Sequence, residues 1–160
     1  FEISTSTHDT KRTDVGIEVD AYSYERFYKF LNAVADKYEN WTQVAKENNI
    51  SSYYKKLDFT EVAGGYYWVG EDWHIDDEVQ YQAYFNVTKS GGNIQYEMTI
   101  ISFGDKLYDP DENFFARCDD VYLTFANPKE LRKVINFMNI ESNEEVKKYL
   151  NRPKKDDLFK

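Results

Sequence analysis

The sequence contains few of the residues that build covalent or metal frameworks. Of its 160 residues, one is cysteine, two are histidine and three are proline. A single thiol, Cys118, excludes an internal disulfide and any zinc site made of several cysteines. The histidines are His8, in a polar segment, and His74, far away in the sequence. We therefore expect no base beside Cys118 and interpret it as a buried apolar residue.

Long apolar runs and an excess of positive charge are also missing. No stretch approaches the roughly 20 apolar residues that cross a bilayer. Acidic residues outnumber basic ones by 29 to 20, and the net charge of -9 repels phosphate backbones and anionic lipid head groups. Phosphate-binding glycine loops and nucleophile elbows are absent as well. We predict no nucleic-acid partner and no membrane insertion.

Aromatic residues are abundant, with 14 Tyr, 11 Phe and 3 Trp. Tyrosine supplies apolar area and keeps a hydroxyl group for water or a partner, so it suits both a core edge and a contact surface. A chain of this length is expected to form one globular domain over residues 1–160. The polar ends, 1–13 and 152–160, are expected to be frayed tails.

The clearest pattern lies between Glu78 and Phe103. Apolar and polar residues alternate on both sides of Gly91-Gly92, which is typical of two antiparallel strands with one buried face. A four-residue loop, 89–92, would set the register of this hairpin. The predicted pairs are Val87 with Ile94, Phe85 with Tyr96, Ala83 with Met98, and Tyr81 with Ile100.

Three helices are predicted from apolar spacing and capping residues. Apolar residues three and four apart indicate a long helix from about Ser23 to Asn48, with Ser23 as its cap. Asn127-Pro128-Lys129-Glu130 is a strong helix start, because Asn127 can cap and Glu130 can bond back to the cap amide. The same logic at residues 142–145 predicts a short helix through Leu150.

The remaining segments complete an α+β fold. Short strands are expected at 15–19, 66–69 and 121–125, a helical turn at 50–60, and a polar loop at 104–120. The most economical arrangement is a single curved antiparallel sheet of four to five strands packed on one long N-terminal helix, with two short C-terminal helices.

One candidate metal site is Asp72-Trp73-His74-Ile75-Asp76. On an extended backbone Asp72, His74 and Asp76 point to one side, about 7 Å between successive members. An imidazole between carboxylates can bind a divalent metal or act as a base. The alternative is an acidic turn between two strands, since strand side chains diverge and turns favour Asp.

A second candidate resembles a calcium loop. Asp109, Asp111, Asn113 and Asp120 have the spacing of ligand positions 1, 3, 5 and 12 of such a loop. Phe114 occupies the position where the loop geometry requires glycine, and its flanks are not clearly helical. We expect no cofactor, and calcium is the alternative for which this loop offers ligands.

The polar face of the predicted hairpin is the candidate binding surface. Neutral amides and hydroxyls with little charge suit hydrogen bonding to a protein or a carbohydrate. Aromatic residues between Tyr66 and Trp73 could extend this surface. The candidate binding residues are Gln80, Gln82, Tyr84, Asn86, Gln95, Glu97, Tyr67 and Trp73.

Residues Lys37-Tyr38-Glu39-Asn40-Trp41, followed by Val44-Ala45-Lys46-Glu47-Asn48-Asn49, resemble a segment of small exported proteins of unknown function from Bacteroidetes-type bacteria. The resemblance covers part of one helix and brings no functional residues. It implies an extracytoplasmic location, periplasmic or secreted. The first residue, Phe1, is compatible with removal of a signal peptide and equally with an arbitrary chain boundary.

Three functions fit these observations. The first is an exported binding or interaction domain without catalytic activity. The second is a metal-dependent module or hydrolase that uses one of the two carboxylate groups above. The third is an acidic, toxin-neutralising (immunity-type) protein, to which the net charge is suited and for which no residue is diagnostic.

Overall fold

The computed structural model describes residues 2–6, 14–20, 23–69, 72–102, 107–109, 114–116 and 120–140. For 2–6, 14–15, 66–69, 72–77, 107–109 and 114–116 the description covers the backbone. In chain order the elements are β1 Glu2–Ser6, β2 Asp14–Glu18, α1 Tyr24–Glu47, β3 Tyr53–Val69, β4 Asp72–Ser90, β5 Asn93–Ser102, β6 Leu107–Asp109, β7 Phe114–Ala116, β8 Val121–Phe125 and α2 Pro128–Met138.

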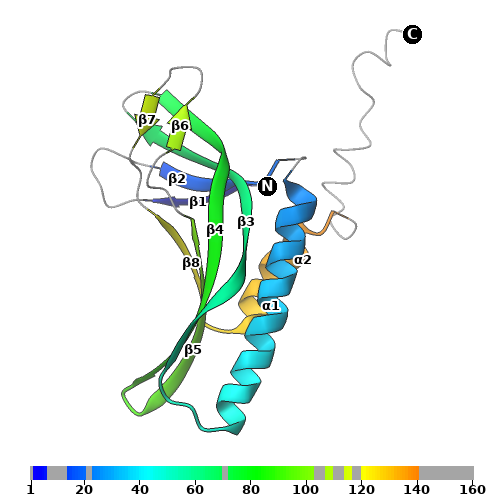
Figure 1. The fold of residues 1–160 in the computed structure, drawn as a ribbon, viewed down its shortest axis with the longest axis vertical. Helices are drawn as coiled ribbons and strands as arrows, with labels where there is room; N and C mark the ends of the chain where they lie inside the picture. The colour runs from blue at the N-terminus through cyan, green and yellow to red at the C-terminus, as the bar shows by residue number, and fades with distance from the viewer. Residues whose placement is uncertain are drawn as a thin grey trace.

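Six strands form one open antiparallel sheet in the order β1-β2-β3-β4-β5-β8, and α1 and α2 lie on one side of it (Figure 1). The α+β class and the antiparallel sheet are confirmed. The predicted strand number was too low, because part of the expected tail forms β1. Strands β6 and β7 pair separately, within the segment predicted to be a loop.

The β4–β5 hairpin keeps the predicted buried face but not the predicted register. Ser90 pairs with Asn93, so the loop has two residues, and Val87 faces Tyr96 where Ile94 was expected. Gly91 and Gly92 have φ values of 58° and 88°, which the tight turn requires and glycine adopts without strain. The register differs by two residues, and a shift of two leaves every side chain on its own face.

Strand β3 replaces the helical turn predicted at residues 50–60, and it is bent by a bulge. Lys56 pairs with Tyr84 and Thr60 with Gln82, so three residues of β3 lie opposite Ala83 of β4. An insertion of this kind bends the strand and increases its twist. The bulge interrupts the apolar alternation between Tyr53 and Phe59, which explains why the sequence pattern did not indicate a strand.

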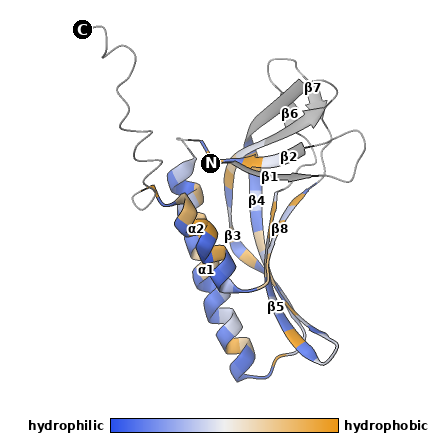
Figure 2. Ribbon diagram, turned by 180° about the vertical axis from the view of Figure 1, so that it is seen from behind, coloured by the Kyte–Doolittle hydropathy of each residue, from blue (hydrophilic) through white to orange (hydrophobic). Residues whose placement is uncertain are grey.

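Helix α1 packs its apolar stripe against the inner face of the sheet. Bands of hydrophilic and hydrophobic residues alternate along β3, β4 and β5, as expected for strands with one covered face (Figure 2). The predicted stripe is largely confirmed, while Trp41 is half-buried and Val44 is exposed. The buried apolar residues of α1 are Phe27, Phe30, Leu31, Val34, Ala35, Tyr38 and Ala45.

The start of α1 differs from the prediction. Ser23 makes no side-chain cap bond to the helix. Its N–H donates instead to Asp20 Oδ1 at 2.7 Å, and its hydroxyl donates to the same oxygen. The carboxylate of Asp20 therefore accepts the bonds at this helix end, where negative charge is favoured by the helix dipole.

Helix α2 begins as predicted. Asn127 Oδ1 accepts a hydrogen bond from the N–H of Glu130 at 3.2 Å, and Pro128 occupies the first turn. The Glu130 carboxylate reaches back to the N–H of Ala126 at 2.9 Å, one residue before the expected cap amide. The predicted helix at residues 142–150 lies outside the described residues. Within the described part of the chain, neither helix combines the length and apolar content needed to cross a membrane.

The two helices are joined by Arg132 of α2. Its guanidinium donates to Glu39 Oε1 at 2.9 Å and to Asp36 Oδ1, both on α1. The Arg132 hydrogen bond is the main reason why the pKa of the Glu39 carboxyl lies below its usual value. These groups are partly exposed, so the interaction orients α2 more than it stabilises the fold.

The hydroxyl of Tyr38 lies where β8 separates from β5. Its oxygen is 2.7 Å from the carbonyl oxygen of Tyr96 and 2.8 Å from that of Phe125. The side chain is fully buried, and burial is the main reason why its pKa lies above the ordinary value of 10.0. Tyr38 thus connects the core of α1 to backbone groups of two strands.

We expect Tyr38→Phe to lower the free energy of unfolding by about 1–3 kcal/mol, because the buried Phe125 carbonyl and the partly buried Tyr96 carbonyl lose the hydroxyl group that they share. Denaturation with urea measures this change. Tyr53→Phe is the control, since Tyr53 is exposed and its hydroxyl is accessible to water. Equal stability of the two variants would contradict the role assigned to Tyr38.

Tyr38 also makes stability depend on alkaline pH. Below about pH 9 its phenol is neutral in both states and contributes no pH dependence. Above that pH the unfolded tyrosine loses its proton while folded Tyr38 keeps it, so the free energy of unfolding falls as pH rises. The fall between about pH 9 and about pH 11 should be steeper in the wild type than in Tyr38→Phe. Urea denaturation across this range provides the comparison, and parallel curves would argue against it.

Candidate functional site

The side of the sheet away from the helices is the larger candidate surface. The register places Lys56, Tyr84, Thr99 and Thr124 in one row across β3, β4, β5 and β8. Directly paired residues project from the same side of a sheet. The hydroxyl groups of Thr99 and Thr124 are 3.0 Å apart, which confirms that neighbouring members of this row meet.

Three tyrosines stand on this outer face. The rings of Tyr54 and Tyr84 stack, with centroids 5.6 Å apart and an interplanar angle of 20°. Tyr122 lies on the other side of Tyr84, because the sheet order places β8 and β3 on opposite sides of β4. Tyr54 and Tyr122 are 65% and 60% exposed, and no paired strand or helix of the described chain covers them. We call Tyr54, Tyr84 and Tyr122 the tyrosine face.

The phenols of Tyr54 and Tyr122 have pKa values above the ordinary tyrosine value. The pKa of Tyr122 lies above its usual value because of partial burial and the neighbouring carboxylate of Asp120. The Tyr122 hydroxyl donates to Asp120 Oδ2 at 3.3 Å. Partial burial and proximity to Tyr84 also raise the pKa of Tyr54. Tyr54 and Tyr122 therefore present apolar rings with neutral hydroxyl groups.

Gln82 does not belong to the exposed surface, contrary to the prediction that it faces solvent. Its side chain is fully buried. The side-chain amide donates to the carbonyl of Leu57 at 2.9 Å and that of Phe59 at 3.1 Å. Both carbonyls belong to the bulge in β3. Gln82 therefore supplies hydrogen bonds that β4 cannot provide opposite the inserted residues.

The other predicted contact residues of the hairpin remain near the surface. Gln80 and Gln95 are exposed, and Asn86 and Glu97 are half-buried. Asn86 lies directly between Tyr54 and Glu97 in the register. Tyr67 and Trp73 are placed by their backbone in the paired ends of β3 and β4. Their side chains lie outside the description.

Sequence reasoning missed two members of the tyrosine face. Tyr54 was missed because its segment was interpreted as a helical turn. Tyr122 could have been found, since the alternation at residues 121–125 indicates a strand whose even-numbered positions face outward. What no local pattern reveals is that these two residues lie on either side of Tyr84.

The structure does not bring the predicted metal ligands together among the residues whose side chains it describes. Asp72, His74 and Asp76 lie in β4 as the expected alternating set, with their side chains outside the description. Asp109 pairs with Phe114 in the β6–β7 hairpin, Asp111 and Asn113 lie outside the described residues, and Asp120 is half-buried. Among the described residues no group of three His, Cys, Asp or Glu is placed to hold a metal. Both metal sites stay predictions.

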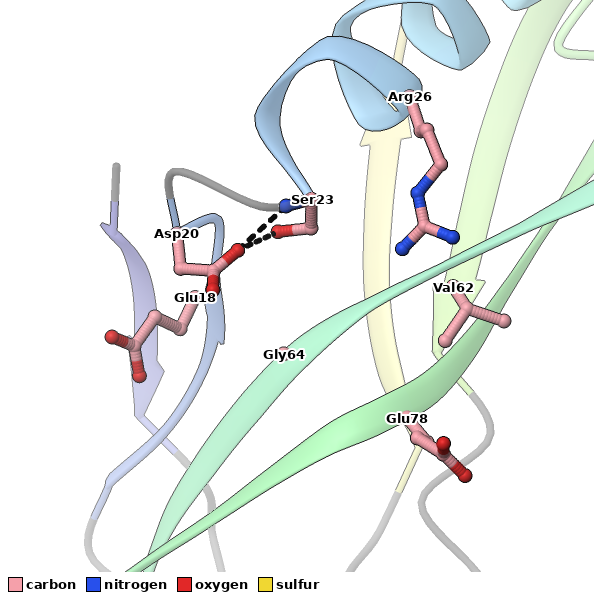
Figure 3. Close-up of a pocket in the computed structure, with 7 residues that line it drawn as sticks. All are labelled: Glu18, Asp20, Ser23, Arg26, Val62, Gly64 and Glu78. Carbon is pink, nitrogen blue, oxygen red and sulfur yellow. Dashed lines mark hydrogen bonds between the residues drawn. The ribbon is translucent and has the colours of Figure 1, made fainter.

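A pocket of about 560 Å³ lies where β2, α1, β3 and β4 meet. Arg26 points into it, while the carboxylates of Glu18 and Glu78 point in different directions (Figure 3). Arg26 Nε is 3.9 Å from Glu61 Oε1. Because the carboxylates do not converge, the pocket lacks the arrangement that a metal ion requires. The lining residues are Glu18, Asp20, Ser23, Arg26, Val62, Gly64 and Glu78.

No protein-family model, curated protein or solved structure matches the chain.

Gln82 is buried and Gln80 is exposed, so substitutions of these two glutamines compare a structural role with a surface position. We expect Gln82→Ala to lower the free energy of unfolding by about 1–3 kcal/mol, because buried carbonyls of the bulge lose their donor. Gln80→Ala should change it by less than about 0.5 kcal/mol, since Gln80 is exposed. Urea denaturation of both variants tests this, and similar losses would contradict the assignment.

Proposed function

We propose that this chain is a binding domain without catalytic activity, and that the tyrosine face is its contact surface for a partner protein. The observation that carries the proposal is the exposure of Tyr54 and Tyr122 on either side of Tyr84. Most large aromatic side chains of a domain are buried, so exposed rings gathered on one sheet face support a role in contact.

The chemistry around the tyrosine face suits protein recognition. Tyrosine offers a large, rigid contact area, loses little entropy on binding and has a hydroxyl group that can donate a hydrogen bond. Asn86 of β4 and Thr99 of β5 lie between Tyr54 of β3 and Tyr122 of β8, and they supply neutral polar groups. Lys56 and Glu97 lie on the same face and can pair with opposite charges of a partner.

An extracytoplasmic location is part of this proposal, supported by the resemblance of residues 37–49 to small exported proteins. The net charge of -9 favours a partner with a basic surface, because long-range attraction speeds encounter. A neutral carbohydrate is the other ligand class that aromatic rings and amides can bind, and the experiment below distinguishes the two.

Tyr54→Ala and Tyr122→Ala should each weaken binding of the partner at least tenfold, which corresponds to about 1.4 kcal/mol, while the melting temperature changes little. The wild-type chain is used to enrich proteins from extracts of the source cells. The affinity of a purified candidate for each variant is then measured by calorimetry.

Phe137→Ala is the matched control, because Phe137 on α2 is 66% exposed against 65% for Tyr54. It removes a similar exposed ring from another surface and should leave the affinity unchanged. Equal loss in all three variants, or no loss in the tyrosine variants, would contradict the proposed surface. Retention of neutral oligosaccharides in place of a protein, with the same dependence on tyrosine, would change the ligand class.

A further inference from the structure

Strand β8 ends the six-stranded sheet, and among the described residues no other strand pairs with its outer edge. It pairs with β5 on one side, in a continuous register without a bulge. Its sequence, Val121-Tyr122-Leu123-Thr124-Phe125, contains no charged residue and no proline. Natural proteins normally place lysine, proline or bulges on such edges, because exposed backbone groups are ready to pair with another strand.

The backbone groups of β8 that face away from β5 can be assigned. The N–H of Val121 donates to Ser102 Oγ of β5 at 3.0 Å. The carbonyl of Phe125 accepts from Tyr38, whose oxygen also lies 2.7 Å from the Tyr96 carbonyl of β5. Residues 121 and 125 therefore direct their backbone groups toward β5. Because these directions alternate along a strand, Tyr122 and Thr124 direct theirs toward the open edge.

This edge is complementary to itself. We propose that two copies of the chain associate through their β8 strands, antiparallel about Leu123, to form one sheet that continues through both subunits. In this register Tyr122 pairs with Thr124 of the partner subunit, and both residues direct their backbone groups outward. Pairs of this type exchange two hydrogen bonds each.

The side chains are compatible with the same register. Leu123 is half-buried and would lie opposite Leu123 of the partner subunit, where close pairing buries further apolar area. The nearest charged residue, Asp120, would lie opposite Ala126 of the partner subunit, so no like charges face each other. This dimer does not depend on the proposed function. It would place the tyrosine faces of the two copies on one surface.

Light scattering after gel filtration tests the proposal on the full chain. At about 100 μM, a concentration suited to a small interface, we expect a mass of twice the 19.0 kDa of one chain. Thr124→Pro should restore the single-chain mass, because proline removes an outward N–H and is tolerated where that group faces solvent. Thr124→Ala keeps the N–H and should remain dimeric.

Hydrogen exchange of the wild-type chain provides a second test without any substitution. The amides of Tyr122 and Thr124 should exchange at least tenfold more slowly at about 100 μM than after dilution to about 1 μM. The amide of Leu123, which points toward β5, should show no such dependence. A single-chain mass at the higher concentration, a dimeric Thr124→Pro variant, or exchange independent of concentration would overturn the proposal.

Discussion

The packing of α1 against the inner face of β3, β4 and β5 is the interaction on which the rest of the structure depends. A straight sheet contacts a long helix over a short distance, and the bulge opposite Ala83 bends β3 so that contact is extended. The bulge exposes carbonyl groups, and Gln82 supplies their hydrogen bonds from within the sheet. One polar side chain thereby satisfies backbone groups that the bulge leaves without a partner on β4.

The sequence predicted those parts of the fold that local patterns determine. The long helix, the start of α2 at Asn127 and the buried face of the hairpin followed from spacing and capping, which act over a few residues. The strand at 66–69 was predicted, but the first part of β3, from Tyr53, was missed, because a bulge breaks the period of two and the compensating amide of Gln82 comes from another strand. The hairpin register was also missed, since faces alone do not distinguish loops of two and four residues.

The candidate surface was predicted in outline and corrected in detail. Tyr84 and Asn86 were assigned to it from the hairpin pattern. Tyr54 and Tyr122 come from strands at different positions in the chain, and only the sheet order brings them to either side of Tyr84. Gln82 was assigned to the same surface but is buried. Alternation gives the side of the sheet from which a residue projects, but it does not show that a bulge in the neighbouring strand encloses the side chain.

The turn at Gly91-Gly92 has a consequence for how this hairpin can change during evolution. With a two-residue turn kept, two residues added to the tip shift the pairing of the two arms by two positions. The apolar residues then stay on the inner face, and α1 still packs against them. One added residue would turn every side chain of one arm over if the turn kept two residues. The tip can therefore lengthen by even steps with the same type of turn, while an odd step requires a three-residue turn with its own bulge.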